Sequence, residues 1–209
     1  MNTRHALISA SFAAAALVGA APAQAITTFF NDWESVDFGS AAGFTVLPAY
    51  EGWTTTAGSG IEVQFNNVAG LPLSGENLVE LDSFNNSEMS RPIDAGNYTL
   101  TFYYSARPGR ASATNGIDVR LNGATIFSVT GDGGNQTDWK LQTVNFSLLA
   151  PGTLSFAAIG TSDGLGGYLE NLKLGAAVPE PASWALMVGG FALAGAALRR
   201  RSKLVPASA

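Results

Sequence analysis

The chain has 209 residues, a formal net charge of −5, no cysteine and a single histidine. The absence of cysteine excludes disulfide frameworks, thiolate zinc sites and cysteine nucleophiles, and the acidic balance argues against a nucleic-acid partner, which requires a basic face. Composition changes twice along the chain. We therefore expect an N-terminal signal peptide over 1–25, one domain over 26–177 and a separate C-terminal segment over 178–209.

The first segment has the three parts of a secretory signal peptide. A basic start precedes an apolar, alanine-rich run over 6–18, and small residues follow it. Ala23 and Ala25 occupy the two positions that a signal peptidase reads, so we predict cleavage before Ile26. A membrane anchor is the alternative, but the apolar run is shorter than the roughly 20 residues that span a bilayer.

The middle segment has the pattern of an all-β domain. It holds six Lys and Arg against 15 Asp and Glu, a net charge of −9, and no His or Cys. Asn122-Gly123 predicts a two-residue hairpin, because Asn and Gly accept the positive φ angles of a type I′ turn. We expect a two-sheet jelly-roll β-sandwich of about nine strands. Alternating runs occur at 61–65, 98–105, 117–121, 125–129, 143–148, 154–158 and 168–174.

The domain also carries a series of short motifs in a fixed order. They are Trp33-Glu34, Gly52-Trp53, Gly60-Ile61-Glu62-Val63, Val79-Glu80-Leu81-Asp82-Ser83, Asn86-Ser87-Glu88-Met89-Ser90, Tyr98-Thr99-Leu100-Thr101-Phe102 and Leu169-Glu170-Asn171-Leu172. This order resembles galactose-binding-like jelly rolls, which include carbohydrate-binding modules and plant cell-wall domains of unknown function. The resemblance implies a β-sandwich, often with a glycan ligand and one structural calcium ion.

Glu170 is the residue on which a calcium site would depend. By the two-residue period of a strand it shares a face with Leu172 and Leu174, which predicts an inward carboxylate that needs a partner or a cation. In the resembling family an acid near the end of the last strand binds calcium together with an acid on the first strand. Here these positions hold Glu170 and Glu34, although the family has Asp where this chain has Glu170. The alternatives are a carboxylate that reaches solvent, or one paired with Arg91, Arg107, Arg110 or Arg120.

A glycan site needs aromatic side chains that stack on a sugar ring and polar groups that read its hydroxyls. Tyr103 faces away from the predicted core side of its strand. For Trp53 and Trp139 the alternative is a place in the core. The polar loop over 131–135 lacks the lysine and following helix of a phosphate site. The candidates are Trp53, Trp139, Tyr50 and Tyr103 as aromatic platforms, and Glu62, Glu80 and Asp82 as acceptors.

The last segment combines a Pro-Glu-Pro box, an apolar stretch and an arginine cluster. The apolar stretch over 185–198 has 14 residues, or 17 counted from Ala182, which is near the lower length limit of a transmembrane helix. An aromatic residue stands at its start, and arginines belong on the cytoplasmic side by the positive-inside rule. We therefore predict a short transmembrane helix with the domain outside the inner membrane. The residues that carry the pattern are Pro179, Glu180, Pro181, Trp184, Ala185, Arg199, Arg200 and Arg201.

This tail resembles the PEP-CTERM sorting signal of Gram-negative bacteria, in the variant with Trp-Ala after the box. The resemblance covers 178–201 and implies recognition by exosortase, a membrane-embedded cysteine transpeptidase-like enzyme, with cleavage near the box. It also implies an inner-membrane intermediate, a final place at the cell surface or in the extracellular matrix, and an organism that makes extracellular polysaccharide. The chain departs from the family in the longer stretch after the arginines, over 202–209. A plain anchor that is never cut is the alternative.

Catalysis has little support in the domain. Without His or Cys the usual nucleophilic triads are absent, and no carboxylate pair among the 15 acids is singled out by spacing. We expect a non-catalytic protein that binds glycan or exopolysaccharide and needs no cofactor beyond calcium. The alternatives are a structural or adhesive biofilm-matrix protein without sugar binding and a carboxylate-dependent glycan hydrolase. The expected partners are signal peptidase, exosortase and, transiently, the inner membrane, with no nucleic acid.

Overall fold

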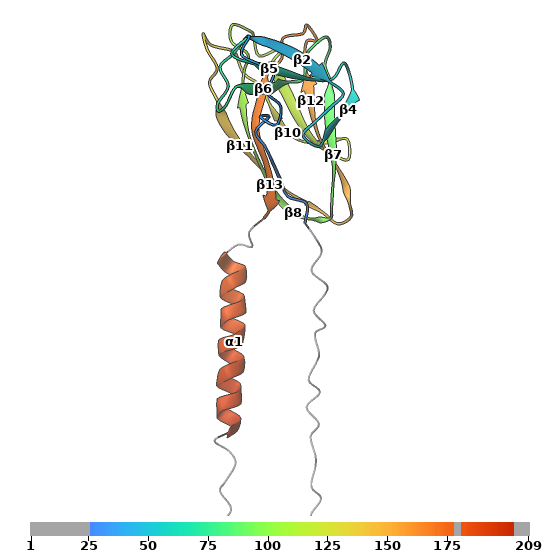
Figure 1. Cartoon of the computed structure of the whole chain (residues 1–209). Helices are drawn as coiled ribbons and strands as arrows, with labels where there is room; N and C mark the ends of the chain where they lie inside the picture. Colours follow the sequence, from blue (N-terminus) through green and yellow to red (C-terminus); the bar gives the residue numbers. More distant parts are fainter. Residues whose placement is uncertain (1–25, 178–180, 203–209) are drawn as a thin grey trace, which may run out of the picture.

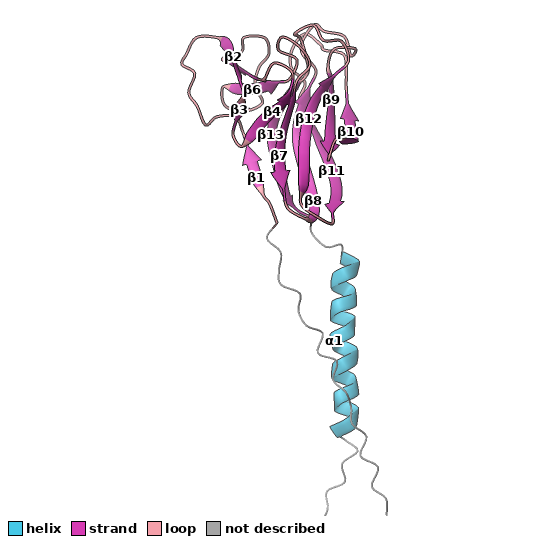
Figure 2. Cartoon of the chain, turned by 90° about the vertical axis from the view of Figure 1, so that its right-hand side faces the viewer, coloured by secondary structure: helices cyan, strands magenta, loops and turns pink. Residues whose placement is uncertain are grey.

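The computed structural model describes residues 26–177 and 181–202. Residues 26–177 form two antiparallel sheets packed face to face (Figures 1 and 2), which confirms the predicted all-β sandwich. The predicted signal peptide and its cleavage residues Ala23 and Ala25 lie outside the described residues, as do Pro179 and Glu180 of the box.

The seven-stranded sheet has the order β11-β8-β13-β6-β5-β2, and β1 also pairs with β13. β13 therefore has two neighbours on one side, β6 at its start and β1 at its end. The bounds are β1 Phe29–Asn31, β2 Gly43–Leu47, β5 Ile61–Phe65, β6 Asn77–Glu80, β8 Gly96–Ser105, β11 Lys140–Leu148 and β13 Tyr168–Ala176.

The six-stranded sheet has the order β10-β9-β12-β7-β4-β3. The turn between β9 and β10 confirms the predicted hairpin, because Asn122 and Gly123 have φ angles of 52° and 81°. The bounds are β3 Ala49–Tyr50, β4 Trp53–Ala57, β7 Glu88–Ile93, β9 Gly116–Leu121, β10 Ala124–Val129 and β12 Gly152–Ile159.

The predicted number of strands was wrong, since the two sheets contain thirteen. The difference arises from short strands: β1, β3 and β6 have three, two and four residues. A segment of this length is too short to show a two-residue alternation, so periodicity does not detect it.

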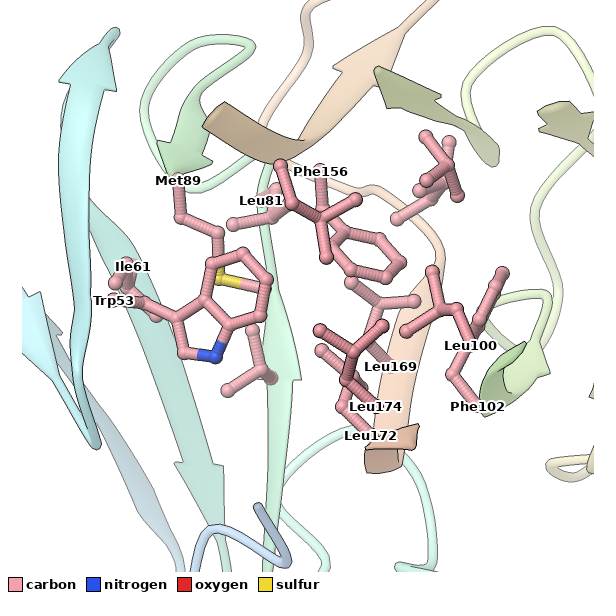
Figure 3. Close-up of a cluster of buried hydrophobic side chains, with 14 of the residues drawn as sticks. Trp53, Ile61, Leu81, Met89, Leu100, Phe102, Phe156, Leu169, Leu172 and Leu174 are labelled. Atoms are coloured by element: carbon pink, nitrogen blue, oxygen red, sulfur yellow. The ribbon is translucent and has the colours of Figure 1, made fainter. Parts of the chain in front are cut away.

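Aromatic and aliphatic side chains from both sheets fill the space between them (Figure 3). The Trp53 and Phe102 rings each meet the Phe156 ring edge to face, with centroids 5.5 and 5.1 Å apart. Trp53 has no exposed surface, and its Nε1 donates to Asn31 Oδ1 over 3.0 Å. Tyr50 is also buried, and its hydroxyl donates to a backbone carbonyl. The prediction that Trp53 and Tyr50 form sugar platforms is therefore wrong, because both belong to the core.

The helix α1 (Pro181–Ser202) contains the apolar stretch of the C-terminal segment, and Figure 1 shows it apart from the sandwich. The side chains of Trp184, Val188 and Phe191 are each more than half exposed. Over the described part of the chain, no helix has both the length and the apolar character needed to cross a membrane. The predicted transmembrane helix is therefore not confirmed.

Candidate functional site

The structure brings four of the seven predicted ligand residues to the outer face of the seven-stranded sheet, the face turned away from the core. Glu62 is paired with Glu80, and Glu80 with Tyr168, so the three side chains point to one face. Tyr103 points the same way, because its neighbours in β8 belong to the core. Trp139 precedes β11, and its ring lies 6.5 Å from the Tyr168 ring. Residues from distant parts of the sequence thus meet here.

The two glutamates on this face are covered. Glu62 is 5% exposed and Glu80 is fully buried. Glu80 accepts hydrogen bonds from Gly166 N and Arg107 Nη1, and Gln64 Nε2 donates to both glutamates. Burial raises the pKa of Glu80 well above its usual value, and the Arg107 charge opposes that shift. The prediction that both carboxylates read sugar hydroxyls directly is wrong, because neither is accessible.

The loop over 66–76, which joins β5 to β6, lies over this part of the outer face. The Tyr168 hydroxyl donates to Ala69 O over 3.1 Å, and Trp139 Nε1 donates to Leu71 O over 3.0 Å. Side chains of the sheet therefore hold the backbone of the loop. Trp139 itself remains partly exposed beside it.

A β-bulge places Glu170 on the outer face instead of the core side. The register between β13 and β8 shifts after Glu170, and Asn171 has a φ of 49°. Glu170 is paired with Tyr103, whereas Leu172 points into the core. The prediction that Glu170 and Leu172 share a face is therefore wrong, because an extra residue interrupts the two-residue period.

The residues predicted for calcium do not fit the ion as they are placed. Both Glu170 oxygens accept from Leu73 N over 3.0 Å, and one also accepts from Ser74 N. Glu34 in turn accepts from Asn77 N over 2.8 Å. Burial raises the pKa of Glu170 to about 8, more than the two backbone amides lower it. Each carboxylate thus faces N–H donors, and the described residues contain no group of three acidic, His or Cys side chains that could hold a metal.

Asp82 organises a loop away from the outer face. It is fully buried and accepts hydrogen bonds from Asp163 N, Gly164 N and the Ser162 hydroxyl at 3.1 to 3.3 Å. These three partners lie in the segment between β12 and β13. The prediction that Asp82 contacts a ligand is therefore wrong, because its carboxylate is occupied in holding this loop.

The surface is hollowed beside Leu71, whose carbonyl accepts from Trp139. A cavity of about 240 Å³ opens between the loop over 66–76 and the loop over 130–139. Amide side chains can donate to and accept from sugar hydroxyls, and the apolar residues offer a surface for the ring. The lining residues are Asn67, Ala69, Gly70, Leu71, Pro108, Asn135 and Gln136.

A smaller cavity of about 90 Å³ lies on the other side of the loop over 130–139. Its lining includes Gln136, Asp138 and Lys140, so Gln136 borders both cavities. Sequence reasoning missed this loop, having only excluded a phosphate site in it. Its run of short polar residues directly after a strand is the available signal, because binding residues concentrate on loops carried by a rigid scaffold.

Residues 177–201 match the model of the PEP-CTERM protein-sorting motif. The chain carries a PEP-CTERM sorting motif. This confirms the prediction made from the box, the apolar stretch and the arginines. The motif marks the chain as exported and directed to the cell surface, and it implies processing by exosortase.

Other similarities concern the β-sandwich. A Multifunctional-autoprocessing repeats-in-toxin protein of Vibrio vulnificus is 29% identical over 129 residues, which is 58% of this chain and 2% of the toxin. A family 35 carbohydrate binding module from Clostridium thermocellum is 16% identical with a TM-score of 0.41, covering 72% of this chain and 99% of that one. The K1 cleaved adhesin domain of Lys-gingipain from Porphyromonas gingivalis is 16% identical with a TM-score of 0.42, covering 73% and 99%. At these identities each structural likeness concerns the fold alone.

Proposed function

We propose that the domain is a non-catalytic glycan-binding module and that its ligand is extracellular polysaccharide at the cell surface. The cavity between the loops over 66–76 and 130–139 carries this proposal, because apolar residues and exposed amides line it together, and Trp139 donates to the backbone of Leu71 in its wall. Buried glutamates support the absence of catalysis. Glu62 and Glu80 are the two carboxylates that strand pairing places together, and both are closed off from a substrate.

In the proposed complex a sugar ring packs against Leu71 and Pro108, next to the exposed part of Trp139. Asn135 and Gln136 hydrogen-bond its hydroxyls from the opposite side of the cavity. The Trp139 ring is held in place by its bond to Leu71 O, so little side-chain freedom is lost on binding. These features support an ordered site that takes one or a few sugar units.

Titration calorimetry against purified neutral and acidic polysaccharides, including the exopolysaccharide of the producing organism, tests this proposal. We expect N135A and Q136A, two exposed residues of the cavity lining, each to weaken binding at least tenfold while the melting temperature stays unchanged. T54A, an exposed substitution on the other sheet, is the matched control and should bind as the parent does. The proposal fails if the parent binds no polysaccharide or if the three variants bind alike.

We also propose that exosortase recognises the Pro-Glu-Pro box in an inner-membrane intermediate of a Gram-negative cell. Support comes from the matched motif, with Pro179, Glu180 and Pro181 followed by Trp184 and an arginine cluster. Replacing the three box residues with alanine should leave the unprocessed mass in the envelope fraction. Processing of that variant at the parent's rate would overturn the proposal.

A further inference from the structure

The strand β11 is an edge strand without the usual protection. An edge strand presents unpaired N–H and C=O groups to other chains unless it is short, bulged or charged. At the other edges β2 has five residues and β3 has two, and β10 is interrupted by a register shift between Thr125 and Phe127. By contrast, β11 has nine residues in unbroken register with β8. It is thus the longest regular edge of the sandwich.

The residues of β11 favour further pairing. Lys140 at the first position is its only charge, and the strand contains neither Pro nor Gly. Such a segment, with Val, Phe and Thr among its residues, has high β-propensity and low charge. Leu141 is 55% exposed, while Phe146 and Leu148 are only partly buried against the core. Packing at this edge is therefore incomplete within one copy.

We infer that β11 pairs with β11 of a second copy of this chain, antiparallel about a two-fold axis at Val144. This register overlaps all nine residues, more than any other two-fold arrangement of the strand. It places Thr143 opposite Asn145 of the other copy and Lys140 opposite Leu148, so no like charges meet. The interface is isologous, with the same strand on both sides, and it closes at two copies.

The pairing joins two seven-stranded sheets into one and turns both outer faces the same way. It does not depend on glycan binding. Together with the proposed function, it gives a particle with two sugar cavities on one surface, which strengthens attachment to a repeating polymer.

The direction of the strands decides where pairing takes place. Ala177, the last described residue of the sandwich, is held at one end of it by the hydrogen bond that its N–H donates to Asn97 O. In the antiparallel pair the two copies of Ala177 lie at opposite ends. Two copies attached to one surface through their C-terminal segments have parallel strands and cannot pair in this way. Pairing therefore takes place after release or between opposing surfaces.

Disulfide cross-linking tests the register directly, because the chain contains no cysteine of its own. The double variant T143C/N145C is prepared as the full chain in mild detergent and oxidised. The side chains of alternate residues in one strand are parallel and about 6.8 Å apart, whereas the Cβ atoms of a disulfide lie about 3.8 Å apart, so an internal disulfide does not form. We expect a covalent dimer linked between positions 143 and 145. The control T54C/T56C, on an inner strand of the other sheet, should stay monomeric. Equal cross-linking of both variants, or none, overturns the inference.

A double lysine variant of β11 tests the same pairing by a second measurement, the self-association of the chain. T143K/N145K sets lysines of the two copies opposite each other, so we expect self-association in sedimentation velocity to weaken at least tenfold at an unchanged melting temperature. T54K/T56K adds the same charge elsewhere and should associate as the parent does. A parent that is monomeric at all concentrations measured overturns the inference, whatever its affinity for polysaccharide.

Discussion

Replacing Arg107 with alanine tests whether the buried carboxylates of the outer face depend on one cation. Among the described residues Arg107 is the ion-pair partner of Glu80, and its side chain is 15% exposed while that of Glu80 is fully buried. Removing one partner of a buried pair leaves an uncompensated charge and costs about 3–5 kcal/mol. We therefore expect R107A to lower the free energy of unfolding by about 3–5 kcal/mol at neutral pH.

The size of this loss should depend on pH. Burial raises the folded-state pKa of Glu80 well above its usual value. A carboxyl with a raised folded pKa contributes stability that is fully present below its unfolded pKa, about 4.3. That contribution is lost as the pH rises through the folded pKa. Without Arg107 the folded pKa rises further, so the loss of stability in R107A should shrink towards about pH 4.

Urea unfolding of the parent and the variant, followed by tryptophan fluorescence at several pH values, measures both effects. K140A is the matched control, because the Lys140–Asp138 pair is 67% and 78% exposed at its two ends. Such surface pairs contribute about 0–1 kcal/mol. The double variant E80Q/R107A should recover most of the stability lost in R107A. A loss in R107A no larger than that in K140A, or a loss independent of pH, would refute this reasoning.

Three further predictions follow from the same contacts. Because the carboxylates of Glu34 and Glu170 face N–H donors, the melting temperature should be equal in calcium and in chelator; a rise with calcium that E34A abolishes would contradict this. The Glu170 pKa of about 8 implies that stability falls as pH rises from about 4.3 to 8. In E170Q the urea midpoint of unfolding should therefore change less over this pH interval than in the parent. An equal change of the midpoint with pH in both proteins would disprove the role of Glu170. W53A empties a fully buried site and should cost about 3–5 kcal/mol in urea unfolding, whereas a loss as small as that of the exposed variant T54A would show that the core tolerates the cavity.

The fold could be predicted from the sequence where strands are long enough to alternate. The runs over 98–105 and 168–174 gave central strands of the seven-stranded sheet, and Asn122-Gly123 gave the hairpin turn. The failure at Glu170 has a specific cause. A two-residue period assumes regular pleating, and the bulge with Asn171 at positive φ breaks it. Asn is enriched at positive φ angles, so Asn171 is weakly indicative of an irregular strand. The residues around it do not by themselves predict a bulge.

The candidate site could be predicted in part. The alternation of the run over 98–105 correctly placed Tyr103 away from the core. Charged residues at outward positions are usually exposed, and sequence alone did not indicate that Glu62 and Glu80 are buried or that the loop over 66–76 lies over the neighbouring Tyr168 and Trp139. This loop is held by backbone groups that accept from Tyr168 and Trp139, a type of contact that depends on tertiary placement and leaves no residue pattern.

Under the proposed pairing, attachment of the chain through the segment that carries the sorting motif prevents β11 from pairing with a second copy. A long, regular and nearly uncharged edge is a hazard for an exported chain, because it can pair with any neighbour before the chain reaches its destination. Attachment through the C-terminal segment gives neighbouring copies parallel strands, which excludes the two-fold register about Val144. The processing that we propose at the motif over 177–201 would remove that constraint. The same segment that directs the chain to the surface would thus delay its assembly until arrival, which explains how an unprotected edge is tolerated.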